Sequence, residues 1–307
     1  MQHINSLAAA PQGPLCLAFG RFDGLHAGHR AVLKRLLARP GHPSLLLSFS
    51  GSPAPFFYTE AEKALLLRDS GLGTLLSLPA AEMEALGAEA FARDILAGAL
   101  HARRVVTGAD VRFGREGLDV AALAAFGEKY GFRVETVPTV KMNGLPVSKE
   151  SIRQAAAAGD YAAMLALLGR PYLLAGQVVH GKAAGHKHGL PTANLSLTPG
   201  KLLPPYGVYA TLAHLEAGTY WGVTNIGLRP SDDDIPLPTV ETLLLDFQGD
   251  IYGQPLALEV CRYIRGIRKF QGGLDEVRKQ VDQDSLQVRA YMESHPALAR
   301  SLAPGKK

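Results

Sequence analysis

The sequence contains little of what secreted, membrane-spanning or cysteine-rich metal proteins require. Only two cysteines occur, Cys16 and Cys261, far apart and without metal-ligand spacing, so we expect free, buried thiols in a reducing compartment. No apolar run approaches the roughly 18 residues of a membrane span. No basic stretch leads into an apolar run at the N-terminus, as it would in a signal peptide. We therefore expect a cytoplasmic protein without a membrane partner.

The chain also lacks a strong excess of charge. Its net charge is +4, and the basic residues form only short clusters, a pattern that does not favour a nucleic-acid partner. Hydrophobic residues make up 47% of the chain and charged residues 20%, as in ordinary globular proteins. A length of 307 residues is sufficient for two domains. We expect small-molecule substrates and a monomer or weak homo-oligomer.

Residues 1–168 alternate short apolar runs with helical segments. The first pair is the run Leu15–Phe19 and the helix Gly28–Leu37, and a longer helix is expected over Ala88–Leu100. Strands separated by helices predict an α/β Rossmann-like domain with a parallel sheet. Ligands of such sheets bind beyond the carboxyl ends of the strands.

Residues 172–307 follow a different pattern, which begins after the break at Gly169–Pro171. Short β-rich runs are separated by glycine and proline, and a final helical segment covers Leu274–Met292. This spacing predicts a small antiparallel β-barrel domain with a C-terminal helix.

The first candidate site is the string GRFDGLHAGH at 20–29, where the first strand meets the first helix. His26 and His29 lie three residues apart at the helix start, so both can face an anion beside the free N–H groups of the helix. Gly28 allows the backbone to approach phosphate closely, and Gly20 ends the strand tightly. A glycine turn with two capping histidines is the alternative, but the length of the string favours a phosphate site.

The second candidate site is a glycine-rich, basic loop that contains Gly181, Gly185 and Lys187 and leads to Thr192 and Asn194. Loop N–H groups and cations can hold phosphates, and two neutral oxygen ligands leave Mg²⁺ free to bridge phosphate oxygens. Residues two apart on a strand face the same side, so the Thr and Asn can converge on one ion. Alone, the segment PTAN at 191–194 would favour a turn, and it is the order of the motifs around it that favours a metal site.

The order of these motifs resembles the bacterial bifunctional riboflavin kinase/FAD synthetase family. The first string, followed by TGADVRFG at 107–114, is similar to the adenylyltransferase half. The series PYGVYA at 205–210, NIGLRP at 225–230 and VETLLLDF at 240–247 is similar to the riboflavin kinase module. The resemblance implies that Mg-ATP phosphorylates riboflavin to FMN, and that FMN is adenylylated to FAD.

The resemblance also implies roles for individual residues. His26 and His29 would hold ATP phosphates during adenylyl transfer, and Asp23 would lie near the reacting phosphates or the metal. Glu241 would be the general base on the ribityl 5′-hydroxyl of riboflavin. Thr192 and Asn194 would hold Mg²⁺. The other implied residues are Gly20, Gly28, Gly181, Gly185, Lys187 and Arg153 at phosphates, and Asp110, Phe113, Asp284 and Arg289 at the flavin.

Several positions depart from the family pattern. Arg21 stands where Asn is usual, Ser50–Pro53 replaces Glu-Pro-His-Pro, and His186 stands where Arg is usual in the second half. Glu150 and Ser151 replace a Thr and an Arg, which removes a fixed positive charge from a phosphate site and adds a negative one. Two alternatives therefore remain. The protein could be a riboflavin kinase whose first domain is degenerate or altered in specificity, or a non-catalytic flavin-binding protein.

Overall fold

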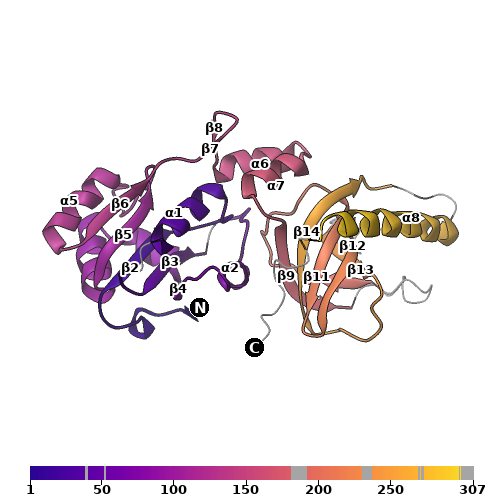
Figure 1. The fold of residues 1–307 in the computed structure, drawn as a ribbon, viewed down its shortest axis with the longest axis horizontal. Coiled ribbons are helices and arrows are strands. Elements are labelled where there is room, and N and C mark those ends of the chain that lie inside the picture. The colour runs from indigo at the N-terminus through magenta and orange to yellow at the C-terminus, as the bar shows by residue number, and fades with distance from the viewer. Residues whose placement is uncertain are drawn as a thin grey trace. The chain divides into compact units, whose positions relative to one another are not determined.

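The computed structural model describes residues 1–38, 41–51, 53–180, 192–229, 237–268, 270, 273–296 and 298. The chain forms two compact units, Met1–Ile152 and Arg153–Lys307 (Figure 1). This division falls earlier in the chain than the predicted ranges 1–168 and 172–307. Over the part of the chain that the structure describes, no helix is both long and apolar enough to cross a membrane.

The first unit is built on one parallel sheet. Its strands are β1 (Gln2–Ile4), β2 (Leu15–Gly20), β3 (Ser44–Ser50), β4 (Thr74–Pro79), β5 (Ala102–Gly108) and β6 (Arg133–Val137). Their order is β1-β4-β3-β2-β5-β6, and every neighbouring pair is parallel. The chain moves outward from β2 through β3 to β4 and then returns to β5 on the other side. The order in which the chain adds strands therefore reverses between β2 and β5, and such a switch point is where folds of this kind bind ligands.

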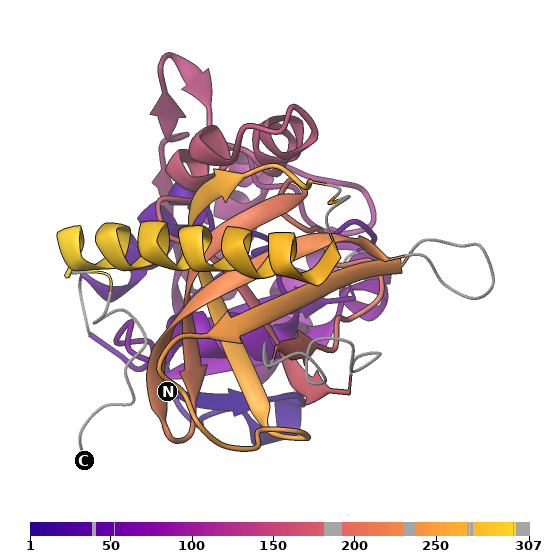
Figure 2. The same cartoon turned by 90° about the vertical axis from the view of Figure 1, so that its right-hand side faces the viewer.

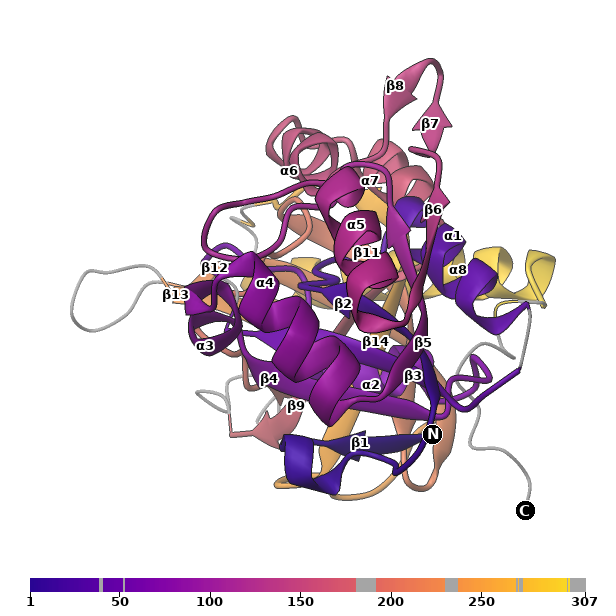
Figure 3. The same cartoon turned by 90° about the vertical axis from the view of Figure 1, so that its left-hand side faces the viewer.

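Helices cover both faces of this sheet. They are α1 (Ala27–Leu37), α2 (Glu60–Leu67), α3 (Ala80–Ala85), α4 (Ala88–Ala90), a π-helix (Phe91–Ala99) and α5 (Val120–Tyr130), with a short 3₁₀ turn at Leu7–Ala9. Figure 3 shows the π-helix and α5 on the viewer's side of the sheet, where Phe91 and Leu123 join its buried core. The central strands are buried on both faces, as in Leu45–Leu47, which explains their continuous apolar runs. The predicted Rossmann-like fold is confirmed.

Besides the strand β1, which was not predicted, two details of the first unit differ from the predictions. The helix expected over Ala88–Leu100 becomes a π-helix from Phe91, and the N–H of Leu100 donates to the carbonyl of Ile95 at 2.9 Å. A hairpin of β7 (Lys141–Met142) and β8 (Leu145–Pro146) was not predicted. Its turn residues Asn143 and Gly144 both have positive φ, and an Asn-Gly pair is a readable hairpin signal.

The second unit is a closed antiparallel barrel with helices outside it. Its strands are β9 (Tyr172–Val179), β10 (Ala193–Leu195), β11 (Gly207–Leu215), β12 (Gly218–Arg229), β13 (Leu237–Leu244) and β14 (Pro255–Arg265), in the order β10-β13-β12-β11-β14-β9. The helices are α6 (Lys149–Ala157), which begins before the division between the units, α7 (Tyr161–Leu168) and α8 (Gly273–Ser294). Figure 2 shows α8 lying across the barrel. The predicted barrel with a C-terminal helix is confirmed.

The two faces of the barrel strands have different environments. Thr211, Thr224 and Thr242 are fully buried, and their hydroxyls form a hydrogen-bonded row at 2.8 and 2.9 Å. The alternate positions face α8, where Val223 packs with Val288 of the helix in one apolar cluster. Because successive strand residues point to opposite faces, the neighbours of Thr224 and Thr242 also point toward the α8 side.

Candidate active sites

A cavity of about 300 Å³ lies at the carboxyl end of the first unit's sheet. It is lined by the turn after β2, the start of α1, the ends of β5 and β6, and residues 147–150. The predicted residues that line it are Gly20, Asp23, His26, Gly28, His29 and Asp110. The structure thus brings most of the predicted adenylyltransferase residues to the switch point between β2 and β5, where the strand order reverses. We call this the histidine cavity.

The two histidines lie against each other at the start of α1. The Nδ1 atom of His26 accepts from the backbone N–H of His29 at 3.4 Å, and the ring centroids are 3.8 Å apart. Burial lowers the pKa of His26 to about 4 and holds the pKa of His29 well below its usual value. Near neutral pH both rings are therefore uncharged, and they can serve as hydrogen-bond donors. Since Nδ1 of His26 accepts, we assign the proton of that ring to Nε2.

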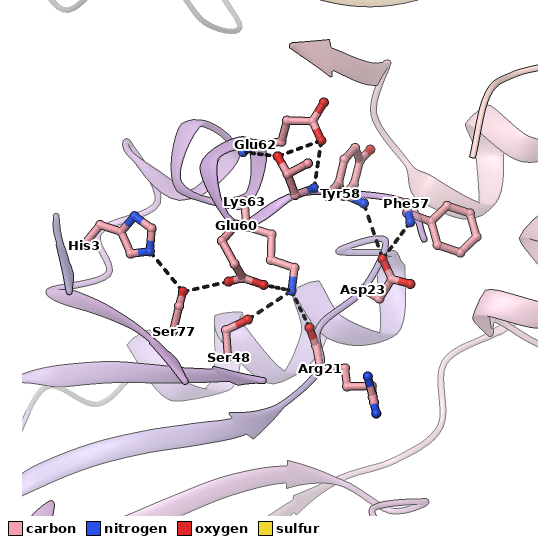
Figure 4. Close-up of polar contacts among 11 residues, drawn as sticks. His3, Arg21, Asp23, Ser48, Phe57, Tyr58, Glu60, Glu62, Lys63 and Ser77 are labelled. Atoms are coloured by element: carbon pink, nitrogen blue, oxygen red, sulfur yellow. Dashed lines mark hydrogen bonds and ion pairs between the residues drawn. The ribbon is translucent and has the colours of Figure 1, made fainter. Parts of the chain in front are cut away.

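The carboxylate of Asp23 is fixed by hydrogen bonds from backbone N–H groups. Its Oδ1 atom accepts from the N–H groups of Phe57 at 2.8 Å and Tyr58 at 3.4 Å, and the residue is 5% exposed. Figure 4 shows this contact between the turn after β2 and the segment before α2. The carboxylate that was predicted near the phosphates thus also ties two segments of the chain together.

Two of the positions that depart from the family pattern, Arg21 and Glu150, line this cavity together with Lys149, whereas Ser151 and the described residues of 50–53 are not among those that line it. The guanidinium of Arg21 forms an ion pair with Glu84 of α3 at 2.8 Å. The carboxylates of Asp110 and Glu150 act to raise the pKa of His26, although desolvation by burial is the larger effect and lowers it. The cavity therefore contains both cations and a carboxylate that the family pattern lacks.

A second cavity of the first unit, about 490 Å³, lies beside the first and shares Gly20, Arg21 and Lys149 with it. Phe113 lines this second cavity but not the histidine cavity. Its ring packs 6.2 Å from those of Phe19 and Phe91. The cavity thus combines an aromatic wall with positive charge, and its other cations are Arg112 and Arg115.

Arg153, which was predicted at phosphates, belongs to the second compact unit and is not among the residues that line the histidine cavity.

A cavity of about 310 Å³ lies on the outer face of the barrel and is lined by Thr192, Glu241 and residues of α8. We call it the barrel cavity. Glu241 on β13 is the direct cross-strand partner of Asn194 on β10 and of Asn225 on β12. Directly opposed residues of an antiparallel pair share one face. The predicted base therefore lies beside the predicted ligand Asn194 and shares the cavity with the predicted ligand Thr192, although Asn194 is not among the described residues that line the cavity.

Asp284 and Arg289 have different surroundings. Asp284 is 1% exposed, lines the barrel cavity, and accepts from Nε and a terminal nitrogen of Arg265 at 2.9 and 2.7 Å. Arg289 does not line this cavity and forms an exposed ion pair with Asp246 at 2.7 Å. The predicted residues Gly181, Gly185 and Lys187, and the substituted His186, lie outside the described residues.

Three site residues were missed by the sequence analysis. Asn225 and Arg265 line the barrel cavity, and the buried Lys63 contacts the turn after β2. Asn225 lies inside the quoted NIGLRP motif, so that motif could have indicated it. The other two have no local signal, because only the fold brings their partners near. The structure shows a capping box at Thr59–Glu62 that begins α2, but such a motif marks only a helix start and not the contacts of Lys63.

Comparisons with known proteins agree with both halves of the molecule. The family described as FAD synthetase matches residues 9–151, and the family described as riboflavin kinase matches residues 168–292. Bifunctional riboflavin kinase/FMN adenylyltransferases from Escherichia coli K12 and Pseudomonas fluorescens are 34% and 33% identical to this chain. The matches cover 94% and 91% of the chain, and 96% and 94% of those proteins.

A crystal structure described as a macrolide-efflux protein from Streptococcus pneumoniae has the same overall fold. Its TM-score is 0.77 at 27% identity, and the match covers 94% of this chain and 98% of that one. Together with the two family matches, the identity to the curated relatives shows that this chain belongs to the bifunctional riboflavin kinase/FMN adenylyltransferase family.

Proposed function

We propose that this protein phosphorylates riboflavin to FMN with Mg-ATP and adenylylates FMN to FAD. The observation that carries the proposal is the position of Glu241, which lies beside Asn194 and lines one cavity with Thr192. A carboxylate next to neutral oxygen ligands suits transfer of a phosphoryl group to an alcohol. The two reactions are consecutive, because the product of the first is the substrate of the second.

In the kinase step, Glu241 accepts the proton of the ribityl 5′-hydroxyl. The 5′-oxygen then bonds to the γ-phosphorus of ATP while the bond to ADP breaks. Thr192 and Asn194 supply neutral oxygens that fit a hard divalent cation. When bound there, Mg²⁺ supplies positive charge to the transferring phosphoryl group. The buried pair of Arg265 and Asp284 gives the barrel cavity a fixed polar wall.

In the adenylyl step, a phosphate oxygen of FMN attacks the α-phosphorus of ATP, and pyrophosphate leaves. His26 and His29 donate hydrogen bonds to phosphate oxygens from the start of α1, where backbone N–H groups also point toward the anion. No covalent intermediate on the protein is needed, since positioning and electrostatics carry such transfers. Asp110 lines the same cavity, and we place the FMN beside it, toward Phe113.

The runner-up is a riboflavin kinase without FAD formation. The carboxylate of Glu150 near His26 favours it, because a negative charge there opposes ATP. Incubation with riboflavin and Mg-ATP, followed by separation of the flavins, decides between the alternatives. We expect FMN first and FAD later. FMN alone would support the runner-up, and neither product would indicate a flavin-binding protein.

Replacing Gly28 by alanine tests the phosphate turn. An added Cβ would lie 3.1 Å from the ring of His26, which is tighter than ordinary contacts, so the ring must move by a few tenths of an ångström. Because misplacement by about 1 Å can cost on the order of 100-fold, we expect FAD formation to fall about tenfold. Rates of FMN and FAD formation measured on the same preparation check this, and the FMN rate should not change.

We also propose a cytoplasmic location. Both cysteines, Cys16 and Cys261, are free and buried, as expected where thiols stay reduced.

A further inference from the structure

The side chain of Lys63, on α2, is only 1% exposed. Its Nζ atom donates to the carbonyl of Arg21 at 2.6 Å, to Oγ of Ser48 at 3.0 Å and to Oε1 of Glu60 at 2.7 Å (Figure 4). An ammonium group has three donors, and all three are used here. A buried charge is tolerated only when it is paired and hydrogen-bonded, so these partners define where the ammonium group lies.

The position of Glu60 is itself fixed from a neighbouring strand. Its other oxygen, Oε2, accepts from Oγ of Ser77 on β4 at 2.7 Å, and the same hydroxyl lies 3.0 Å from Nε2 of His3 on β1. Figure 4 shows this chain of contacts running from β1 to the carbonyl of Arg21. The ammonium group of Lys63 is therefore held by several elements of the first unit and is not a mobile surface charge.

The Arg21 carbonyl belongs to a turn with an unfavourable backbone. Phe22 and Leu25 have φ of 45° and 41°, and Gly20 and Gly24 have φ of 142° and 89°. Bulky residues rarely adopt positive φ, and such conformations persist only where the surrounding structure holds them in place. This turn leads directly into His26 and α1, so its conformation sets where the two histidines lie.

A second contact holds the same turn from the same side. Asp23 accepts from the N–H groups of Phe57 and Tyr58, which precede α2. The α2 helix and the segment before it thus form hydrogen bonds with the turn at two points, the carbonyl of Arg21 and the carboxylate of Asp23.

We propose that Lys63 and Asp23 are positioning residues for adenylyl transfer. They hold the turn after β2 in the conformation that places the rings of His26 and His29 for the phosphates of ATP. The inference rests on the proposed adenylyl transfer in the first unit. It differs from the role first predicted for Asp23, since neither residue needs to touch the nucleotide.

Electrostatics support the same role for Lys63. Desolvation by burial is the main reason why the pKa of His29 is low; the positive charge that His26 carries when protonated, and the charges of Lys63 and Lys149, lower it further. The buried ammonium group thus helps to keep His29 as a neutral donor.

The test is Lys63→Met, which keeps the unbranched side chain up to the position of Cε and removes the ammonium group. We expect the KM for ATP in FAD formation to rise about tenfold and kcat to fall by up to about 100-fold, as for a misplaced binding group. The kinase constants of the same chain should not change. Loss of folded protein alone would lower the apparent kcat without changing KM, so the KM shift separates positioning from simple destabilisation. The matched control is Lys129→Met, which removes an exposed lysine that pairs with Glu89 in the same unit.

Histidine-selective ¹⁵N NMR provides a readout that does not depend on activity. In Lys63→Met the ring resonances of His26 and His29 should shift, while those of His214 in the barrel should not. If the wild-type protein makes no FAD, the proposed adenylyl transfer is wrong. The ring resonances would still test whether Lys63 sets the positions of His26 and His29. Unchanged resonances and an unchanged KM in a folded variant would overturn the inference.

Asp23 provides a second pair of variants in case Lys63→Met does not fold. Asparagine keeps a side-chain oxygen that can accept from Phe57 and Tyr58, whereas alanine does not. We expect Asp23→Asn to retain about ten times more FAD formation than Asp23→Ala, a difference typical of one positioning contact. Equal losses in the two variants would show that the charge of Asp23 acts on the substrates or metal, which contradicts a positioning role.

Discussion

Replacing Glu241 by glutamine is expected to reduce FMN formation by about 100- to 10,000-fold, the usual contribution of a positioned general base. Glutamine keeps the shape of the side chain and its place on β13 beside Asn194, but it cannot accept the proton of the ribityl hydroxyl. ATP binding should survive, because the phosphate and metal contacts come from other residues. Single-turnover formation of FMN and equilibrium binding of an ATP analogue measure the two effects separately.

The matched control is Glu216→Gln, which makes the same change at an exposed position of the hairpin between β11 and β12 on the same barrel. It should leave FMN formation unchanged. Near-normal turnover in Glu241→Gln would remove this residue from the role of base. Loss of ATP binding together with turnover would instead assign Glu241 to the nucleotide or its metal.

Most of the fold could be predicted because its signals are local. Strands buried on both faces, such as β3 with Leu45–Leu47, read as continuous apolar runs, and the helices between them read as periodic segments. The strand β1 was missed because Gln2–Ile4 is three residues long and pairs only with β4. The π-helix was missed because its buried residues, Phe91, Ala92, Ile95 and Leu96, recur at a spacing of four residues, which an α-helix also gives.

The sites were predictable to the extent that their residues adjoin in the sequence. His26 and His29 share one helix start, and Thr192 and Asn194 lie two residues apart at the start of β10. Contacts across the chain could not be predicted. Lys63 reaches Arg21 over 42 positions, and Arg21 reaches Glu84 over 63. No local pattern encodes such pairs, because they depend on how α2 and α3 pack against the sheet.

Replacing His29 by alanine is expected to lower FAD formation by about 100- to 1,000-fold, the cost of losing one hydrogen-bond donor to a developing charge. FMN formation should continue on the same chain, so FMN accumulates where the wild-type protein converts it to FAD. The exposed His42 lies in the same unit, and His42→Ala is the matched control. FAD formation within about threefold of wild type would contradict the phosphate role of His29, because that loss of rate is smaller than the loss expected when one hydrogen bond to the phosphates is removed.

The form in which His29 acts can be tested by a further variant, His29→Asn. Because burial holds the pKa of His29 well below neutrality, the ring acts as an uncharged donor, and an amide N–H can replace it in part. We therefore expect His29→Asn to retain more FAD formation than His29→Ala at pH 7. If the ring acted as a cation, the two variants would be equally poor, and wild-type FAD formation would decline as the pH rises through 6 to 7. A flat wild-type profile in that range, together with partial rescue by asparagine, would establish the neutral form.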